Sequence, residues 1–357
     1  MAGPADRRRA RCGRRRPVIR RRGSFHYDDH SVFDRPRRRS RPRTKQRPDY
    51  SDAPVGLVTT VDRGRYRVLL LDESYDPVGP SVQCTKARSL GRKSVIVGDR
   101  VRLDGDVSGM EGTLARIVEV LERTTMLRRT ADDDDPFERP VVANADQLVI
   151  VTALADPPPR TGMIDRILVA GYDAGLDPVL CLTKADLASP DELMAAYAPL
   201  GVPVVVTQPG ADLTELRALL ADKVSVLVGH SGVGKSTLVN ALIPGIDRAT
   251  GGVNVVTGRG RHTSTSAIAL QLPDDGGWVV DTPGVRSFGL SHVTPADVLK
   301  AFPDLVSFTA DCPRGCSHDD DAPACALDEA WQSGDVPRAR VESFRRMITA
   351  RKLPHEM

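Results

Sequence analysis

The sequence has few cysteines, few aromatic residues and no long hydrophobic run. Its 357 residues include 6 cysteines, and aromatic residues make up 4% of the chain. No apolar stretch approaches the roughly 18 residues that a membrane-spanning helix needs. Three of the cysteines lie between residues 312 and 325, a spacing that does not resemble a secreted disulfide framework. We therefore expect a soluble, cytoplasmic protein in a reducing compartment.

Charge is distributed unevenly along the chain. Residues 1–50 hold 18 lysines and arginines against 5 acidic residues, so the rest is acidic although the whole chain carries +3. This basic tail has almost no apolar periodicity, and we expect it to be disordered. No apolar core follows its arginine clusters, as a secretion or twin-arginine signal would require. The tail is either a solvated extension or a contact for RNA phosphates, and charge alone does not decide between them.

Short β-type runs separated by turns fill residues 51–130, where we expect an N-terminal OB-type β-barrel. Tyr66 is the one aromatic residue in the expected strands, which favours recognition of a nucleic-acid backbone or shape over base stacking. The alternative is a barrel that serves only as a rigid spacer. The expected strands are residues 57–61, 66–71, 95–97, 101–103 and 113–120.

Continuous apolar runs alternate with helical stretches over residues 143–290, which is typical of a doubly wound α/β domain with a parallel sheet covered on both faces. The acidic run at 132–136 is expected to be the linker before it. Residues 291–357 are expected to form a C-terminal helical domain, with an amphipathic segment at 336–353. The strands expected in the α/β domain are residues 148–151, 179–182, 204–206, 224–228 and 278–280.

A phosphate-binding loop with the pattern Gly-x4-Gly-Lys-Ser follows the strand at 224–228 and precedes a helical stretch. Glycines let the backbone N–H groups wrap phosphates, and the helix N-terminus adds its positive end. Lys235 is expected to contact the β- and γ-phosphates, and Ser236 to bind Mg²⁺. The predicted nucleotide-binding residues of this loop are Gly229, His230, Ser231, Gly232, Val233, Gly234, Lys235, Ser236 and Thr237.

The run Asp-Thr-Pro-Gly at 281–284 follows the strand at 278–280, as expected for the magnesium side of a nucleotide site. Asp281 is expected to hold the Mg²⁺ shell through water, and the N–H of Gly284 to sense the γ-phosphate. The next residue is Val285, whose apolar side chain cannot orient the attacking water. Intrinsic hydrolysis is therefore expected to be slow.

Residues 258–265 lie where the first switch of a GTPase belongs. Thr263 or Thr265 is expected to complete the magnesium shell, and His262 could orient the attacking water. The alternative for His262 is a structural or solvated side chain in a loop rich in glycine and arginine. The sequence leaves that choice open.

A second nucleotide motif, Thr-Lys-Ala-Asp, ends the strand at 179–182. Asp186 can accept hydrogen bonds from the N1–H and the exocyclic amine of guanine, donors that adenine does not present in that arrangement. Thr183 stands where asparagine is usual, and its single hydroxyl predicts modest nucleotide affinity. Residues 206–208 give a weak signal for contact with guanine O6. The predicted guanine-binding residues are Thr183, Lys184, Ala185 and Asp186.

The guanine motif precedes the phosphate loop, whereas in an ordinary small GTPase it follows that loop. This order marks a circularly permuted GTPase. The permutation has a mechanical consequence, since the segment after Asp281 leads within about thirty residues into the C-terminal domain. Nucleotide state can therefore bias the orientation of that domain.

Three cysteines and a histidine gather within fourteen residues of the C-terminal domain. Four sulfur and nitrogen ligands satisfy tetrahedral Zn²⁺ and leave no open position, which predicts one structural zinc ion. The alternative is a set of unrelated buried cysteines. The predicted ligands are Cys312, Cys316, His318 and Cys325.

From about residue 56 onward the chain resembles the RsgA (YjeQ) family of ribosome small subunit-dependent GTPases. The resemblance rests on the permuted motif order, on Gly-Arg-His-Thr at 260–263, on the run from Asp281 to Arg286 and on the cysteine cluster. It implies OB, permuted GTPase and zinc domains that bind the 30S subunit and its 16S rRNA late in maturation. It also implies hydrolysis of Mg²⁺-bound GTP that the subunit strongly stimulates. We expect a monomer with no membrane partner.

Two other classes of function remain open. One is a nucleotide-gated RNA-binding module whose hydrolysis is incidental. The other is an ATP-dependent small-molecule kinase, against which Asp186 argues because its carboxylate matches guanine.

Overall fold

The computed structural model of the chain describes residues 49–91, 95–130, 138–246, 267–273, 276–282, 288, 290 and 292–350. The chain divides into two compact units, Met1–Pro48 and Asp49–Met357, and every described residue belongs to the second. The predicted acidic linker and all but the last two residues of the predicted basic tail lie outside these ranges. Within them, no helix is long and apolar enough to cross a membrane.

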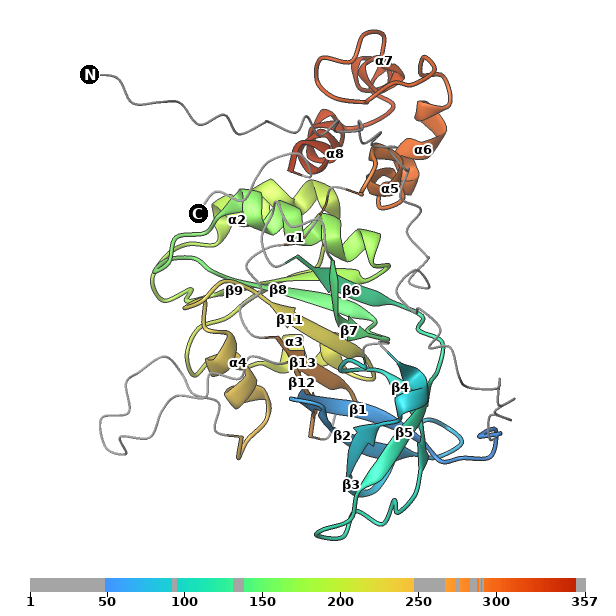
Figure 1. Cartoon of the computed structure of the whole chain (residues 1–357). Helices are drawn as coiled ribbons and strands as arrows, with labels where there is room; N and C mark the ends of the chain where they lie inside the picture. The colour runs from blue at the N-terminus through green and yellow to red at the C-terminus, as the bar shows by residue number, and fades with distance from the viewer. Residues whose placement is uncertain are drawn as a thin grey trace, which may run out of the picture. The chain divides into compact units, whose positions relative to one another are not determined.

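Five strands close into the predicted N-terminal barrel (Figure 1). These strands are β1 (Val55–Asp62), β2 (Arg65–Leu71), β3 (Pro77–Lys86), β4 (Arg100–Asp104) and β5 (Ala115–Val120), with the short 3-10 helix η2 (Arg88–Leu90) after β3. Pairing runs β1-β2-β3-β5-β4, and β4 pairs back with β1, so the barrel has no free edge. Val58, Val68 and Val82 are fully buried inside it.

Two details of the barrel differ from the prediction. The predicted strand at 95–97 is wrong, because the chain turns there: the carboxylate of Asp99 accepts a 2.8 Å hydrogen bond from the Ile96 N–H. Gly98 in this turn has φ +86°, a conformation outside the strand region. Strand β3 was not predicted, because two prolines and a glycine lie in its first half and much of it faces solvent.

The central sheet confirms the predicted α/β fold. Its strands are β8 (Gln147–Ala153), β9 (Asp177–Thr183), β10 (Val204–Val206), β11 (Val224–Val228), β12 (Ile268–Gln271) and β13 (Trp278–Asp281). The five predicted strands are mutually parallel in the order β10-β9-β8-β11-β13. Strand β12, which was not predicted, is antiparallel to β13 and also pairs with β1 through Thr60 and Ile268. The sheet therefore continues into the barrel.

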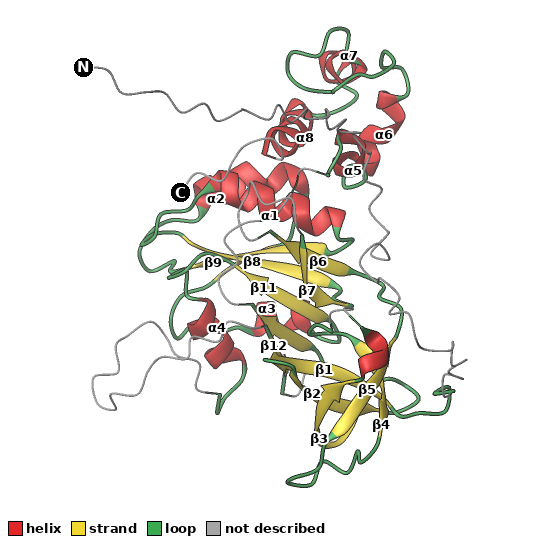
Figure 2. Ribbon diagram, viewed as in Figure 1, coloured by secondary structure: helices red, strands yellow, loops and turns green. Residues whose placement is uncertain are grey.

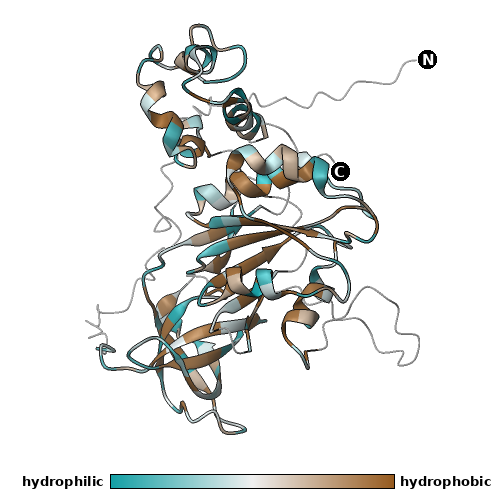
Figure 3. Cartoon of the chain, turned by 180° about the vertical axis from the view of Figure 1, so that it is seen from behind, coloured by the Kyte–Doolittle hydropathy of each residue, from teal (hydrophilic) through white to brown (hydrophobic). Residues whose placement is uncertain are grey.

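Helices cover both faces of the central sheet, as Figure 2 shows. They are α1 (Thr161–Asp173), α2 (Asp191–Tyr197), the 3-10 helix η3 (Ala198–Leu200), α3 (Thr214–Leu220) and α4 (Lys235–Leu242). Because successive side chains of a strand point to opposite faces, Leu148 and Ile150 pack with α1 and α2, whereas Val149 and Val151 pack with α3 and α4. The apolar character of these strands is visible in Figure 3.

A hairpin of β6 (Met126–Arg129) and β7 (Arg139–Ala143) lies between the barrel strands and β8 in the sequence. The Ala143 N–H donates to the Val97 carbonyl at 3.0 Å, and the Asn144 amide donates to the Gly98 carbonyl at 2.8 Å. The hairpin and the residue that follows it therefore contact the turn at Val97 and Gly98, which precedes strand β4 of the barrel. The domain boundaries at 130, 143 and 290 stay predictions.

The described residues from 292 to 350 contain four helices, in agreement with the helical character predicted for this part of the chain. They are α5 (Pro295–Leu299), α6 (Pro303–Thr309), α7 (Ala326–Ser333) and α8 (Arg338–Ala350). Thr294 and Asp297 cap α5 by a reciprocal capping box. Phe344 and Met347 of α8 belong to the same apolar core as Ile167 and Leu168 of α1. The C-terminal helices thus pack directly on the helix layer of the sheet.

Candidate functional site

The phosphate loop lies between the carboxyl end of β11 and the first residue of α4. A Cβ atom on Gly229 would lie 2.3 Å from the Val151 carbonyl oxygen, so a larger residue cannot approach β8 in this way. Gly234 precedes α4 with φ +90°, which lets the chain turn into the helix. The loop therefore presents backbone N–H groups at a helix N-terminus, an arrangement suited to binding phosphate.

Asp281 ends β13 beside the phosphate loop. Strands β11 and β13 pair in parallel with Leu227 opposite Asp281, and the Thr282 hydroxyl donates to the Leu227 carbonyl at 2.8 Å. The Lys235 Nζ lies 4.0 Å from Asp281 Oδ1, and both side chains are largely buried. The structure thus brings together two residues that the sequence places in the catalytic and magnesium sites.

The guanine motif reaches the phosphate loop from strand β9, which is separated from β11 by β8. The hydroxyl of Thr183, a residue 5% exposed, donates to the Val233 carbonyl at 2.6 Å. A single hydroxyl therefore braces the two nucleotide loops against each other. Lys184 has a left-handed backbone, and its ammonium donates to the Asp156 carbonyl.

The loop after β10 lies next to the guanine motif. The Ala185 N–H donates to the Thr207 carbonyl at 3.2 Å, and the Thr207 N–H donates to the Leu182 carbonyl at 2.7 Å. Asp186, which follows Ala185 in the sequence, is exposed to solvent. The weak sequence signal at 206–208 thus marks a loop that holds the guanine motif in place.

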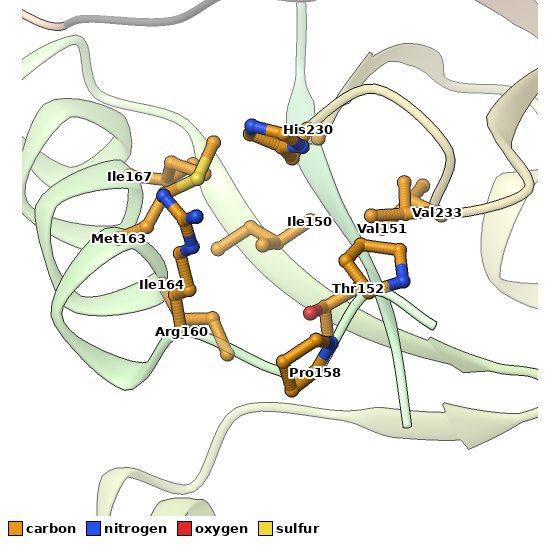
Figure 4. A pocket seen from close by; sticks show the side chains of 12 residues that line it. Ile150, Val151, Thr152, Pro158, Arg160, Met163, Ile164, Ile167, His230 and Val233 are labelled. Atoms are coloured by element: carbon orange, nitrogen blue, oxygen red, sulfur yellow. The ribbon is translucent and has the colours of Figure 1, made fainter. Parts of the chain in front are cut away.

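A small pocket separates the phosphate loop from helix α1 (Figure 4). His230 and Val233 line one side, and Met163, Ile164 and Ile167 of α1 line the other. Its volume is about 20 Å³, too small for a nucleotide. The His230 Nδ1 lies 2.9 Å from the Ser231 carbonyl oxygen. The pocket shows that the phosphate loop faces α1 across apolar side chains, which no sequence motif indicated.

Several predicted site residues lie outside the described ranges. The whole predicted first switch at 258–265 and residues 283–287 lie outside them. Their catalytic and magnesium roles stay predictions. These residues are His262, Thr263, Thr265, Gly284, Val285 and Arg286.

The predicted zinc ligands converge in the C-terminal part of the chain. The ligand atoms of Cys312, Cys316, His318 and Cys325 all lie within 4.8 Å of one another. Cys312 Sγ is 3.6 Å from His318 Nδ1 and 3.9 Å from Cys325 Sγ, and Cys325 Sγ is 3.7 Å from the same nitrogen. Zinc–sulfur bonds of about 2.3 Å in a tetrahedron separate two sulfurs by about 3.8 Å. The four side chains could hold one metal ion.

Arg345 of helix α8 contacts the residues around this cluster. The Arg345 Nε donates to the His318 carbonyl at 3.2 Å, and Arg345 Nη1 pairs with Asp328 Oδ1 at 2.8 Å. Burial, with a smaller contribution from Arg345, lowers the pKa of His318, which favours the neutral imidazole that ligates metals. Burial raises the pKa of the Cys325 thiol to about 11. No sequence motif indicated the supporting role of Arg345.

The fold and the arrangement of its motifs define a circularly permuted P-loop GTPase. Residues 120–291 match the family described as RsgA GTPase. Over 267 residues the chain is 38% identical to the small ribosomal subunit biogenesis GTPase RsgA 1 of Vibrio vulnificus (strain YJ016), covering 72% of this chain and 74% of that protein. Over 284 residues it is 39% identical to the small ribosomal subunit biogenesis GTPase RsgA of Pseudomonas syringae pv. tomato. This match covers 77% of this chain and 80% of that protein.

Solved structures agree with these relatives. The crystal structure of YjeQ from Thermotoga maritima matches with a TM-score of 0.60 and 28% identity, covering 83% of this chain and 97% of that one. The structure of YloQ, a circularly permuted GTPase, matches with a TM-score of 0.61 and 25% identity, covering 86% and 98%. The chain belongs to the RsgA GTPase family and is a GTP-hydrolysing enzyme.

Proposed function

We propose that this GTPase acts on the small ribosomal subunit during late maturation and that the 30S particle stimulates its hydrolysis. The observation that carries the proposal is the contact between Thr183 and Val233, which joins a guanine motif to a phosphate loop that follows it in the sequence. Relatives with 38 to 40% identity are described as small ribosomal subunit biogenesis GTPases. We further propose a cytoplasmic monomer whose barrel contacts the backbone of 16S rRNA.

The nucleotide site supports distinct roles for its residues. The loop from Gly229 to Thr237 wraps the phosphates, and Lys235 compensates charge on the β- and γ-phosphates. Ser236 and Asp281 hold Mg²⁺ with Thr263, and the Gly284 N–H senses the γ-phosphate. The four residues from Thr183 to Asp186 select guanine, with Asp186 accepting from the base.

Hydrolysis needs a group that orients water, because Val285 cannot do so. His262 is our candidate for that role once the small subunit is bound. A histidine that only shapes the loop would leave the stimulated rate unchanged when it is replaced by asparagine.

The cysteine cluster is proposed to bind one structural zinc ion. Three sulfurs and one nitrogen match the ligand preference of zinc. The Cys312, His318 and Cys325 ligand atoms lie 3.6 to 3.9 Å apart, and all four ligand atoms lie within 4.8 Å of one another. The ion would stabilise a C-terminal domain at 291–357, beside an OB domain at 51–130 and a GTPase domain at 143–290.

Turnover of GTP with and without purified 30S subunits tests the proposal. We expect the rate to rise strongly with subunits and to be lost in Lys235→Ala, a control that removes the phosphate contact. A rate that subunits do not raise would contradict stimulation and favour the RNA-binding module with incidental hydrolysis.

Nucleotide selection is tested separately with Asp186→Asn. Xanthine presents an oxygen where guanine has its exocyclic amine, so the asparagine amide should favour xanthosine triphosphate over GTP. Equal binding of ATP and GTP by the unmodified chain would instead support a kinase-like nucleotide site.

A further inference from the structure

One turn of helix α1 contacts both the phosphate loop and the C-terminal helices. Met163, Ile164 and Ile167 line the pocket against His230, as Figure 4 shows. The neighbouring residue Arg166 is only 7% exposed. This turn therefore lies between the nucleotide site and the cysteine-bearing part of the chain.

The Arg166 guanidinium binds two distant carbonyl groups. Its Nη2 donates to the Phe288 carbonyl at 3.0 Å, and its Nη1 donates to the Ala350 carbonyl at 3.1 Å. Ala350 is the last described residue of α8, and it is only 3% exposed. One side chain on α1 thus holds the end of α8 and the backbone at Phe288.

Of the two carbonyl partners of Arg166, Phe288 is the one that follows the Asp281 motif closely in the sequence. It lies six residues beyond Thr282, which is hydrogen-bonded to the strand before the phosphate loop. Phe288 is 3% exposed and shares its apolar core with Leu290 and Val293. A change at the Asp281 turn that shifts the Phe288 backbone therefore acts on a guanidinium that also holds α8.

We propose that Arg166 is a positioning residue that couples the segment after the Asp281 turn to the C-terminal end of α8. One guanidinium binds both carbonyls, so a shift of the Phe288 backbone is transmitted through Arg166 to α8. The bound nucleotide thereby controls the position of the helix behind the cysteine cluster. The proposal rests on GTP binding by this family and does not depend on the ribosome.

Hydrogen exchange of the full chain, loaded with GDP or with a non-hydrolysable GTP analogue, tests the coupling. We expect residues 338–350 of the unaltered protein to exchange at different rates in the two states. Arg166→Met should lose that difference while it still binds both nucleotides. Arg166→Lys keeps the charge on a single nitrogen and should restore part of it.

Arg340→Met is the matched control. Arg340 also donates from α8 to a backbone carbonyl across the same interface, that of Pro199 at 2.9 Å, but this carbonyl belongs to η3 and not to the segment after Asp281. This variant should keep the nucleotide-dependent difference in α8.

Three results would overturn the proposal. The first is equal exchange of α8 in the two nucleotide states of the unaltered protein. The second is a difference that survives in Arg166→Met. The third is loss of the difference in both Arg166→Met and Arg340→Met, which would indicate a merely structural role. If Arg166→Met does not fold, an undiminished difference in Arg166→Lys overturns the proposal.

Discussion

The barrel and the C-terminal helices are joined to the same sheet in different ways. The barrel joins by strand pairing between Thr60 and Ile268, and its buried valines form a core of their own. The C-terminal helices join by side-chain packing, and Phe344 lies in one core with Ile167 of α1. The fully buried residues of the barrel form a separate cluster, and only partly buried Leu57, Val61 and Leu69 pack against the sheet core, whereas helix packing merges the cores. The C-terminal part should therefore respond with the nucleotide domain, and the barrel should respond more independently.

The largest expected effect comes from breaking the cysteine cluster with Cys316→Ala. The variant should lose zinc, which in small metal domains contributes on the order of 10 kcal/mol to folding. Because the cores are merged, hydrogen-exchange protection should fall in α7 and α8 and also in α1, but not in the barrel. Elemental analysis and exchange measurements check both points.

Cys84→Ala, at a buried cysteine of the barrel, is the control that should keep the metal. Stoichiometric zinc in Cys316→Ala would show that the ligand assignment is wrong.

Truncation of the merged core should have the next largest effect. Phe344 is fully buried with its ring 5.2 Å from that of Phe302, so Phe344→Ala should lower the free energy of unfolding by about 3–5 kcal/mol. The sheet and the C-terminal helices should then unfold together at lower denaturant concentration. Val68→Ala is the counterpart in the barrel, with a smaller loss confined to barrel residues. Equal destabilisation of the sheet by both variants would refute the comparison.

Tyr197→Phe tests the packing of the C-terminal helix α8 against helices α1 and α2. The Tyr197 hydroxyl donates to buried Asp165 at 2.8 Å, and Arg346 pairs with the same carboxyl group at 3.0 Å. Burial raises the pKa of Asp165, and loss of the hydroxyl should raise it further. We expect a loss of about 1–3 kcal/mol at pH 7, because the hydroxyl favours the charged form of the carboxyl. The loss should shrink as the pH falls and both folded and unfolded forms become protonated. Denaturant titrations at pH 7 and pH 4 measure this, and a loss independent of pH would contradict it.

Asp304→Asn should have the smallest effect. Arg340 binds the half-exposed Asp304 and holds the pKa of its carboxyl below the usual range. A lowered folded-state pKa contributes stability above the unfolded value, and that contribution disappears as the pH falls towards the lowered value. The variant should cost less than about 1 kcal/mol at neutral pH and nothing in acid. A deficit that persists in acid would show that packing, and not charge, connects α6 to α8.

The sequence predicted the strands with the strongest apolar runs and missed those that depend on partners. All five predicted parallel strands are present, because four of them are largely buried and the edge strand β10 is a run of three partly or fully buried valines, so their composition reflects burial. Strand β3 faces solvent over much of its length, and β12 is only four residues long. Their pairing with neighbours, which composition does not record, makes them strands.

The features of the candidate site also fall into those that the sequence predicted and those that only the fold decided. The motif spacing by itself determined the permuted order, the phosphate loop, the guanine motif and the set of four metal-ligand candidates, because backbone turns and ligand chemistry demand particular residues at fixed intervals. Tertiary structure alone decided that Thr183 braces Val233 and that Arg166 joins Phe288 to Ala350. The residues in these contacts are at least 50 positions apart, and the acceptors are carbonyl groups, which every residue type carries. No pattern of side chains can indicate such a contact until the fold brings its two ends together.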